Sequence, residues 1–437
     1  MWPYHPDLLA TPVPRYTSFP TAAEFGPIPG HAFIEALERV EGEVSLYVHI
    51  PFCEKICFYC GCNTAAAGRR QRLETYLDAL HREAALLADH WPRGVTVKRL
   101  SFGGGSPNAI SPLDFARLLS CLTVHFRLAS PEISIEVDPR AMTEDWAEVI
   151  GSSGITRASL GVQTFSPKAQ EAIGRVQPPE MIERTVGWLR QAGVTSLNFD
   201  LMYGLPGQVW EDLEDTLERS LALDADRIAL FGYAHVPHII PRQRAIPADD
   251  LPGTAARFDM AARGFDYLTA RGYAPVGFDH FARAGTDPLA IAAATGELRR
   301  NFQGFTDDSS SVLIGLGASA ISSFPELLAQ TEKNNGRYRM LLSQDRLPVA
   351  HGIRRSADDR YRGAVIERLL CDGEARLGAR LMGEARAALQ PFIARGLVTV
   401  DDEWLRIKPD GLPYSRSIAA LFDPYRQDSQ RRFSSAV

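Results

Sequence analysis

The chain has 437 residues, 45% of them hydrophobic, so it can bury a large core and form more than one domain. A formal net charge of -6 and a pI near 6.0 disfavour nucleic acid as its main partner. The N-terminus has prolines and polar residues where a secretory signal needs an apolar run, and no apolar stretch reaches the roughly 20 residues that cross a bilayer. We therefore expect a cytoplasmic protein with no membrane span.

Short apolar runs alternate with amphipathic segments from about residue 43 to residue 235. This alternation is typical of repeated βα units around a parallel sheet. The helical segments include Leu73–Asp89, and Ser111 and Thr143 are expected N-caps of later helices. Six units predict an α/β fold with an incomplete (β/α)6 barrel. The predicted strands are Leu46–Ile50, Arg99–Phe102, Ile133–Val137, Ala158–Val162, Ser196–Met202 and Arg227–Tyr233.

The alternation stops at the Pro-rich stretch Val236–Pro252, and a long helical segment, Thr254–Arg271, follows it. After Arg355 the chain reads as amphipathic helices and short strands, which predicts a small, mainly helical or winged-helix-like domain, and a polar tail occupies Arg426–Val437. The predicted parts are an N-terminal extension covering the active site (1–42), a partial barrel (43–240), a region that completes the barrel and the substrate site (241–354) and the C-terminal domain (355–437).

Four of the six cysteines fall between Cys53 and Cys62, directly after the first predicted strand. Disulfides are rare in a reducing compartment, so this clustering indicates metal binding. Cys53, Cys57 and Cys60 have CxxxCxxC spacing, and three thiolates can hold three irons of a [4Fe–4S] cluster while the fourth iron stays open. A zinc site with Cys62 as fourth ligand is one alternative, although zinc sites usually pair two separated CxxC motifs. The other alternative is a cluster that only transfers electrons, and the predicted barrel and the glycine motifs count against it.

Glycines and polar residues recur where the predicted strands end. Ligands of parallel barrels collect at that end, glycines let a ligand approach the backbone, and a buried carboxylate needs a partner such as a ribose diol or an arginine. For each residue alone, a turn or a structural hydrogen bond is an equal alternative, but recurrence at successive strand ends favours a ligand site. The residues are Gly103–Pro107, Glu136, Gln163 with Arg175 beyond it, Asp200 and Ala234.

Several segments between Pro14 and about Phe422 resemble the oxygen-independent coproporphyrinogen III oxidase family, a branch of the radical S-adenosylmethionine (SAM) enzymes. The spacing CxxxCxxC marks only the superfamily, whereas YAHVP and RNFQGFT, in this order, mark the branch. The similar segments are PRYTSFPTA (14–22), YVHIPFCEKICFYCGCN (47–63), SIEVDPR (134–140), SLGVQTF (159–165), NFDLMYGLPGQ (198–208), YAHVP (233–237), DHFA (279–282) and RNFQGFT (300–306).

The resemblance implies that Cys53, Cys57 and Cys60 hold a catalytic [4Fe–4S] cluster, with Tyr47 beside it, and that two SAM molecules bind in one active site. It also implies oxidative decarboxylation of two propionates of coproporphyrinogen III to vinyl groups, through a 5′-deoxyadenosyl radical, to give protoporphyrinogen IX for haem biosynthesis. The implied partners are a reduced flavodoxin- or ferredoxin-like electron donor and the porphyrinogen, and the implied state is a monomer. By motif position, the first SAM contacts Tyr47, Gly105, Glu136 and Ile321, and the second contacts Tyr59, Ser106, Pro107, Gln163, Arg175, Asp200 and Ala234.

Four carboxylates on the implied substrate need basic partners, for which Arg15, Arg299 and Arg300 are candidates. His49 either donates a hydrogen bond near the cluster or is an ordinary core histidine. The chain departs from the family pattern at four places: Tyr59 for phenylalanine, Ser106 for threonine, Gly174 for asparagine, with a looser setting for Arg175, and the insert Ser323–Leu327 near Ile321.

Two further functions stay open. A haem chaperone or a ring-opening porphyrin methyltransferase would share the superfamily chemistry, and YAHVP and the long C-terminal region argue more strongly against the chaperone. A cluster- or zinc-bearing binding protein would not cleave SAM, and the combination of Tyr47, Glu136 and Asp200 disfavours it.

Overall fold

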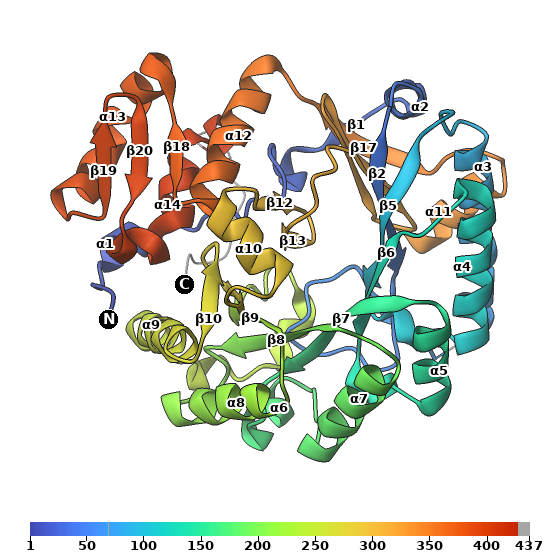
Figure 1. Ribbon diagram of the computed structural model, residues 1–437, viewed down its shortest axis with the longest axis horizontal. Coiled ribbons are helices and arrows are strands. Elements are labelled where there is room, and N and C mark those ends of the chain that lie inside the picture. The colour runs from blue at the N-terminus through green and yellow to red at the C-terminus, as the bar shows by residue number, and fades with distance from the viewer. Residues whose placement is uncertain (69, 427–437) are drawn as a thin grey trace. The chain divides into compact units, whose positions relative to one another are not determined.

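A computed structural model describes residues 1–68 and 70–426 (Figure 1). The predicted polar tail beyond Arg426 lies outside the described residues. The chain forms two compact units, each assembled from separate stretches. Among the described residues, the first unit contains Met1–Glu24, Asp200–Ser309 and 356–426, and the second contains Phe25–Phe199 and Ser310–Arg355. The four-part division expected from the sequence stays a prediction.

A mixed sheet forms the centre of the second unit. Its strands are β1 (Gly26–Pro27), β2 (Glu43–Ile50), β5 (Thr96–Gly104), β6 (Glu132–Val137), β7 (Ile155–Gln163), the start of β8 (Ser196–Tyr203), β14 (Leu313–Leu316), β15 (Ile321–Phe324), β16 (Leu327–Thr331) and β17 (Val349–Arg354). They lie in the order β1-β17-β16-β15-β14-β2-β5-β6-β7-β8. The sheet is parallel from β14 through β2 to β7 and antiparallel from β14 outward to β1. Seven of the eight residues of β2 are buried, as expected for a strand covered on both faces.

Strand register places the functional ends of the strands at one edge of this sheet. β2 pairs in parallel with β5 and with β14, and Ile50 at the end of β2 lies opposite Gly104 at the end of β5. β5, β6 and β7 continue the parallel order. All six strands predicted from the sequence are present, and among the described strands no pairing closes the sheet, so the incomplete barrel is confirmed.

The second unit contains seven described α-helices. They are α2 (Gly30–Glu38), α3 (Arg70–Ala88), α4 (Pro112–Phe126), α5 (Glu144–Ser152), α6 (Pro167–Ala172), α7 (Pro179–Gln191) and α11 (Asn335–Leu342). Of these, α3 to α7 connect the neighbouring strands β2, β5, β6, β7 and β8. Ser111 accepts a hydrogen bond from the backbone of Asp114 at 3.1 Å, and Thr143 accepts one from Trp146 at 3.3 Å, so both predicted N-caps are confirmed. No helix within residues 1–68 and 70–426 is long and apolar enough to span a membrane.

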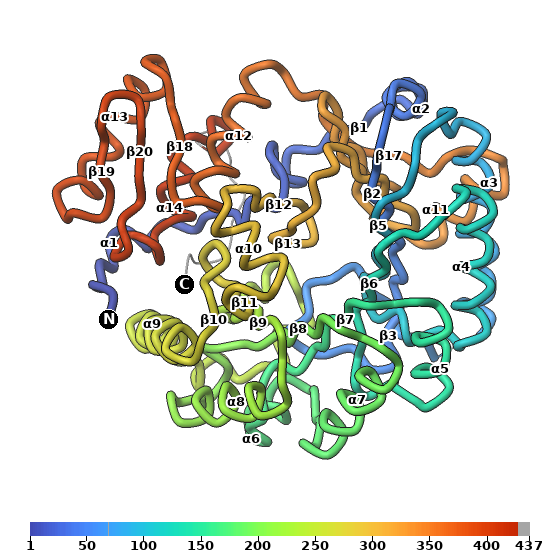
Figure 2. The backbone as a smooth tube through the Cα atoms, in the orientation of Figure 1, coloured from blue at the N-terminus to red at the C-terminus, as the bar shows by residue number. Residues whose placement is uncertain are grey.

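The first unit combines the end of β8 with an antiparallel extension and a C-terminal α+β part. Its strand order is β8-β9-β11-β10, from β9 (Arg227–Gly232), β11 (His280–Arg283) and β10 (Tyr273–Val276). A hairpin of β12 (Arg299–Asn301) and β13 (Gly304–Thr306) and a sheet of β18 (Glu374–Arg376), β20 (Trp404–Ile407) and β19 (Val398–Asp401) complete its strands. The helices are α1 (Pro6–Leu9), α8 (Trp210–Ala222), α9 (Thr254–Thr269), α10 (Pro288–Thr295), α12 (Ala357–Cys371), α13 (Gly378–Ala394) and α14 (Ser415–Ala419), and the backbone can be followed in Figure 2.

Candidate functional site

The loop after β2 carries the four clustered thiols. Cys53 lies in β3 (Phe52–Cys53), which pairs with β4 (Ala65–Ala66); Cys53 and Cys57 are buried, and Cys62 is exposed. Burial raises the pKa of Cys53 to about 11, although a hydrogen bond from Thr64 to its sulfur, at 3.3 Å, opposes this. Among the described residues, no three His, Cys, Asp or Glu side chains already form a metal site.

Two arginines surround the sulfur of Cys57. Nη2 of Arg140 donates to this sulfur at 3.3 Å and Nη1 of Arg175 donates to it at 3.4 Å. Asp138 accepts hydrogen bonds from both guanidiniums, at 2.7 and 3.2 Å. Burial alone would raise the pKa of Asp138, but Arg175 and Arg140 outweigh it and hold this pKa below its usual value. Positive donors of this kind stabilise a thiolate, so the donor set suits an anionic iron–sulfur cluster.

Arg175 is held by every N–H group of its guanidinium. Besides Cys57 and Asp138, it donates from Nε and Nη2 to the carbonyl oxygen of Gly161, at 3.0 and 2.6 Å. A Cβ atom at Gly161 would lie 2.8 Å from Nη2, so only glycine allows this approach. With five N–H groups already engaged, Arg175 can reach a SAM carboxylate only by exchanging one of its partners.

The residue before Arg175 is held against the cysteine loop. Gly174 has φ +66°, and a Cβ atom there would lie 2.9 Å from the ring of Phe58. The backbone N–H of Phe58 donates to the carbonyl oxygen of Ile173 at 2.9 Å. Glycine in place of the family's asparagine therefore makes room for an aromatic contact with the loop.

A hydrogen-bonded chain on β2 leads from Tyr47 to the cysteine loop. The Tyr47 hydroxyl lies 3.0 Å from Nδ1 of His49, and Nε2 of His49 lies 3.3 Å from the carbonyl oxygen of Asn63. A carbonyl can only accept, so His49 carries its proton on Nε2 and accepts from Tyr47 on Nδ1. Burial lowers the pKa of His49 to about 4, which keeps the imidazole neutral at pH 7. His49 therefore positions Tyr47 from a buried, neutral ring.

The three glycines at the end of β5 are required by close packing. A Cβ atom at Gly103 would lie 2.7 Å from the carboxyl group of Glu136, and one at Gly104 would lie 2.8 Å from the ring of His49. At Gly105 it would lie 2.5 Å from the carbonyl oxygen of Phe52. Glu136 also accepts a hydrogen bond from the backbone of Gly104 at 3.0 Å. The glycine run therefore seats Glu136 and the cysteine loop at the same sheet edge.

The other expected SAM contacts are placed as follows. Ser106 and Pro107 are buried after β5, and the Ser106 hydroxyl donates to Oδ1 of Asn108 at 2.5 Å. Gln163 ends β7 with φ +69°, and Ile321 begins β15. Tyr59 is partly buried, and burial raises its pKa while Arg175 opposes this. Asp200 and Ala234 belong to the first unit. Asp200 lies in β8, and Ala234 follows Tyr233 just beyond the end of β9.

The three arginines proposed for the substrate differ in their surroundings within the first unit. Arg299 forms an ion pair with Glu367 at 2.9 Å. Arg300 stacks on Phe305, with 4.3 Å to the ring centroid, and donates to the backbone of Arg15 at 3.0 Å. Arg15 itself lines a cavity. Arg15 thus faces space for a ligand.

Two residues of the site were missed from the sequence, Asp138 and Arg140. The available signal was a pair of opposite charges directly after a predicted strand, in the segment Asp138-Pro139-Arg140. Their partner Arg175 follows a different strand, so their meeting depends on the parallel order of β6 and β7. Local sequence gives no sign of such a contact.

Comparison with known proteins places this geometry in a family. The model of the Radical SAM superfamily matches residues 47–219. The chain is 40% identical to the oxygen-independent coproporphyrinogen III oxidase of Bradyrhizobium diazoefficiens, with 97% of each chain covered, and 38% identical to that of Escherichia coli K12, with 96% of this chain and 94% of the relative covered. The solved structure of coproporphyrinogen III oxidase from Escherichia coli, described as a radical SAM enzyme, superposes with a TM-score of 0.90 at 37% identity, over 97% of this chain and 99% of that one. This chain therefore belongs to the oxygen-independent coproporphyrinogen III oxidase family of radical SAM enzymes.

Proposed function

We propose that this chain oxidatively decarboxylates two propionates of coproporphyrinogen III to vinyl groups and so makes protoporphyrinogen IX. The observation that carries this proposal is similarity over nearly the full length, at 40% sequence identity and at a TM-score of 0.90, to proteins named for this oxidation. Such coverage includes the first unit as well as the cysteine loop. It thereby favours the oxidase over a haem chaperone or a ring-opening methyltransferase.

In this proposal Cys53, Cys57 and Cys60 hold the [4Fe–4S] cluster. The chemistry that the bound cluster and SAM supply is reductive cleavage of SAM, which yields the 5′-deoxyadenosyl radical that removes a hydrogen atom from the substrate. Arg140 and Arg175 donate to the sulfur of Cys57 and thereby stabilise its thiolate. Cys62 is exposed and stays outside the ligand set.

The remaining residues bind and orient SAM. Glu136, seated by the glycines of β5, accepts hydrogen bonds from the ribose hydroxyls of the first SAM, and His49 orients the Tyr47 hydroxyl. Gly105 and Ile321 are the other proposed contacts of this molecule. The proposed contacts of a second SAM are Tyr59, Ser106, Pro107, Gln163, Arg175, Asp200 and Ala234.

The partners follow from the same chemistry. An external one-electron donor of the flavodoxin or ferredoxin type reduces the cluster, and the enzyme acts as a monomer. All six cysteines are free thiols. Free thiols and an iron–sulfur cluster suit a reducing compartment, so we place the protein in the cytoplasm.

The test is anaerobic reconstitution with iron and sulfide, followed by reduction in the presence of SAM and coproporphyrinogen III. We expect 5′-deoxyadenosine and the divinyl product together. Formation of 5′-deoxyadenosine without a vinyl product would contradict the substrate assignment and leave SAM cleavage intact. Absence of any SAM cleavage by a cluster-loaded protein would contradict both.

A further inference from the structure

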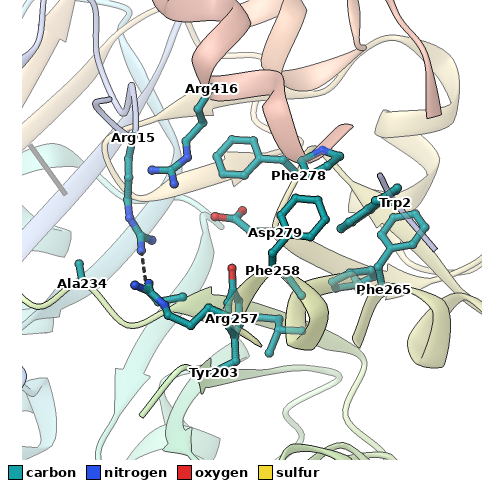
Figure 3. A pocket seen from close by; sticks show the side chains of 15 residues that line it. Trp2, Arg15, Tyr203, Ala234, Arg257, Phe258, Phe265, Phe278, Asp279 and Arg416 are labelled. Carbon is teal, nitrogen blue, oxygen red and sulfur yellow. Dashed lines mark hydrogen bonds between the residues drawn. The ribbon is translucent and has the colours of Figure 1, made fainter. Parts of the chain in front are cut away.

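A cavity of about 60 Å³ lies within the first unit (Figure 3). Its walls come from the N-terminal segment, from β9 and α9, and from the residues before and in α14. One water needs about 10–15 Å³ by this measure, so the cavity holds a few waters or one small acidic arm and not a whole tetrapyrrole. Most of the apolar wall is aromatic and comes from Trp2, Phe258, Phe265, Phe278 and Phe281, with Leu230 and Ala261 beside them.

Three guanidinium groups and a single carboxylate line this cavity. Arg15, Arg257 and Arg416 come from three different parts of the chain; Figure 3 shows Arg15 and Arg416 beside Asp279, and Arg257 below Arg15 near Tyr203. Asp279 is already bound to Nδ1 of His280 at 2.7 Å. The lining therefore carries more positive than negative charge in a place where water is scarce, an arrangement that an anion stabilises.

Arg257 has a buried hydrogen-bond donor that no described residue satisfies. Its Nη2 donates to the carbonyl oxygen of Tyr233 at 2.6 Å, and its side chain lies flat over Gly204, where a Cβ atom would come within 2.8 Å of Nε. Nε is buried and has no hydrogen-bond partner within the described chain. Buried polar groups of proteins are nearly always bonded, so this N–H is a position for a ligand oxygen.

Burial disfavours the charged form of Arg257 and of Arg416, and repulsion from Arg15 adds to this at Arg416. Burial lowers the pKa of Arg257. Burial, with Arg15 adding to it, lowers the pKa of Arg416 to about 10. Both groups would be stabilised by an anion between them, and a carboxylate matches the planar guanidinium fork.

We propose that the guanidinium groups of Arg15, Arg257 and Arg416 bind the carboxylate of one propionate that the enzyme leaves intact. This inference rests on the proposed function, in which two of four propionates are lost. A propionate loses its carboxylate charge when it is decarboxylated. Tight ion pairing of that carboxylate in the ground state would therefore raise the barrier to loss of CO₂. A site of three cations therefore suits an anchored propionate, which fixes the macrocycle so that another propionate faces the radical.

The test uses reconstituted holoenzyme with the substitutions Arg257→Gln and Arg416→Gln. Arg263→Gln is the matched control, because Arg263 lies on α9 like Arg257 but is exposed and stacks on Trp210. We expect the KM for coproporphyrinogen III to rise about 10- to 100-fold in the first two variants, which corresponds to losing a hydrogen bond to a charged group. The KM for SAM, the EPR spectrum of the reduced cluster and SAM cleavage without substrate should stay as in the control.

SAM also carries a carboxylate, and Ala234, a proposed contact of the second SAM, lines the same cavity, so SAM is the competing occupant. A rise in the KM for SAM with an unchanged KM for coproporphyrinogen III would assign the cavity to SAM and overturn the proposal. Unchanged values for both in folded Arg257→Gln and Arg416→Gln proteins would overturn it too. If either glutamine variant does not fold, Arg257→Lys, which keeps the charge but not the fork, must still raise the KM for coproporphyrinogen III. If the wild-type enzyme makes no vinyl product, the proposed function fails. The carboxylate subsite can then be tested alone, by measuring the binding of coproporphyrin III to the wild type and to the glutamine variants through its fluorescence.

Discussion

Arg175 donates a hydrogen bond from Nη1 to the sulfur of Cys57 at 3.4 Å, across 118 positions of the chain. The contact joins the loop after β2 to the segment after β7. It exists because parallel strands bring their carboxyl ends to one edge. Together with Arg140 it places two positive donors beside a proposed cluster ligand, and Asp138 holds both guanidiniums in place.

Replacing Arg175 by lysine should destabilise the second unit. A lysine cannot make the forked bonds to Asp138 and Gly161, so we expect the free energy of unfolding to fall by about 1–3 kcal/mol. Denaturant unfolding of the holoenzyme measures this. Arg184→Gln, at an exposed position of α7, is the control and should change little. Equal stability of the two variants would mean that the network around Cys57 adds nothing.

Cys57→Ala should abolish the EPR signal of the reduced cluster, because only two proposed ligands remain. Cys62→Ala should keep the signal, because Cys62 is exposed and outside the proposed ligand set. Iron content of the reconstituted proteins gives a second readout. Loss of the signal in both variants would show that the ligand set is wrong.

Gly105→Ala should damage the cysteine loop. Its Cβ atom would lie 2.5 Å from the carbonyl oxygen of Phe52 and 2.6 Å from Oγ1 of Thr64, and backbone cannot move aside cheaply. We expect a loss of about 1–3 kcal/mol in the free energy of unfolding, together with a lower iron content. Gly187→Ala, in the open middle of α7, should instead stabilise by about 0.5–1 kcal/mol. A Gly105→Ala protein as stable as wild type and with full iron content would contradict the packing argument.

The stability of the second unit should depend on the protonation of Glu83. Burial raises the pKa of Glu83 from 4.5 to about 7, although the Tyr338 hydroxyl donates to its carboxyl group at 2.6 Å and the backbone of Gly317 at 2.7 Å. The folded state therefore holds a proton that the unfolded state releases. The resulting stability is present below pH 4.5 and is lost as the pH rises through 7, by about 3 kcal/mol in total.

Glu83→Gln removes this titration. Urea unfolding between pH 5 and pH 8 should show a shallower loss of stability in the variant than in the wild type. Glu148→Gln, at an exposed residue of α5, should leave the slope unchanged. Parallel pH profiles for wild type and Glu83→Gln would exclude Glu83 as the source.

Much of the second unit could be predicted from sequence because its signals are local. The apolar runs from Leu46 to Val162 are strands in the structure, and the N-caps Ser111 and Thr143 work through hydrogen bonds three residues away. The strands β14 to β17 were not predicted. β14 pairs with β2, more than 250 positions earlier in the chain, and such pairing leaves no periodic pattern within either strand.

The sequence by itself determined the thiol spacing, the six strands of the incomplete barrel and the motifs that mark the family, since each depends on residues close together in the chain. Only the tertiary structure decided that Asp138 and Arg140 join Arg175 at Cys57, and that Arg15, Arg257 and Arg416 line one cavity. Charged side chains far apart in sequence show no common pattern. They become partners because the fold buries them together, where each charge needs a group of opposite charge or a hydrogen bond.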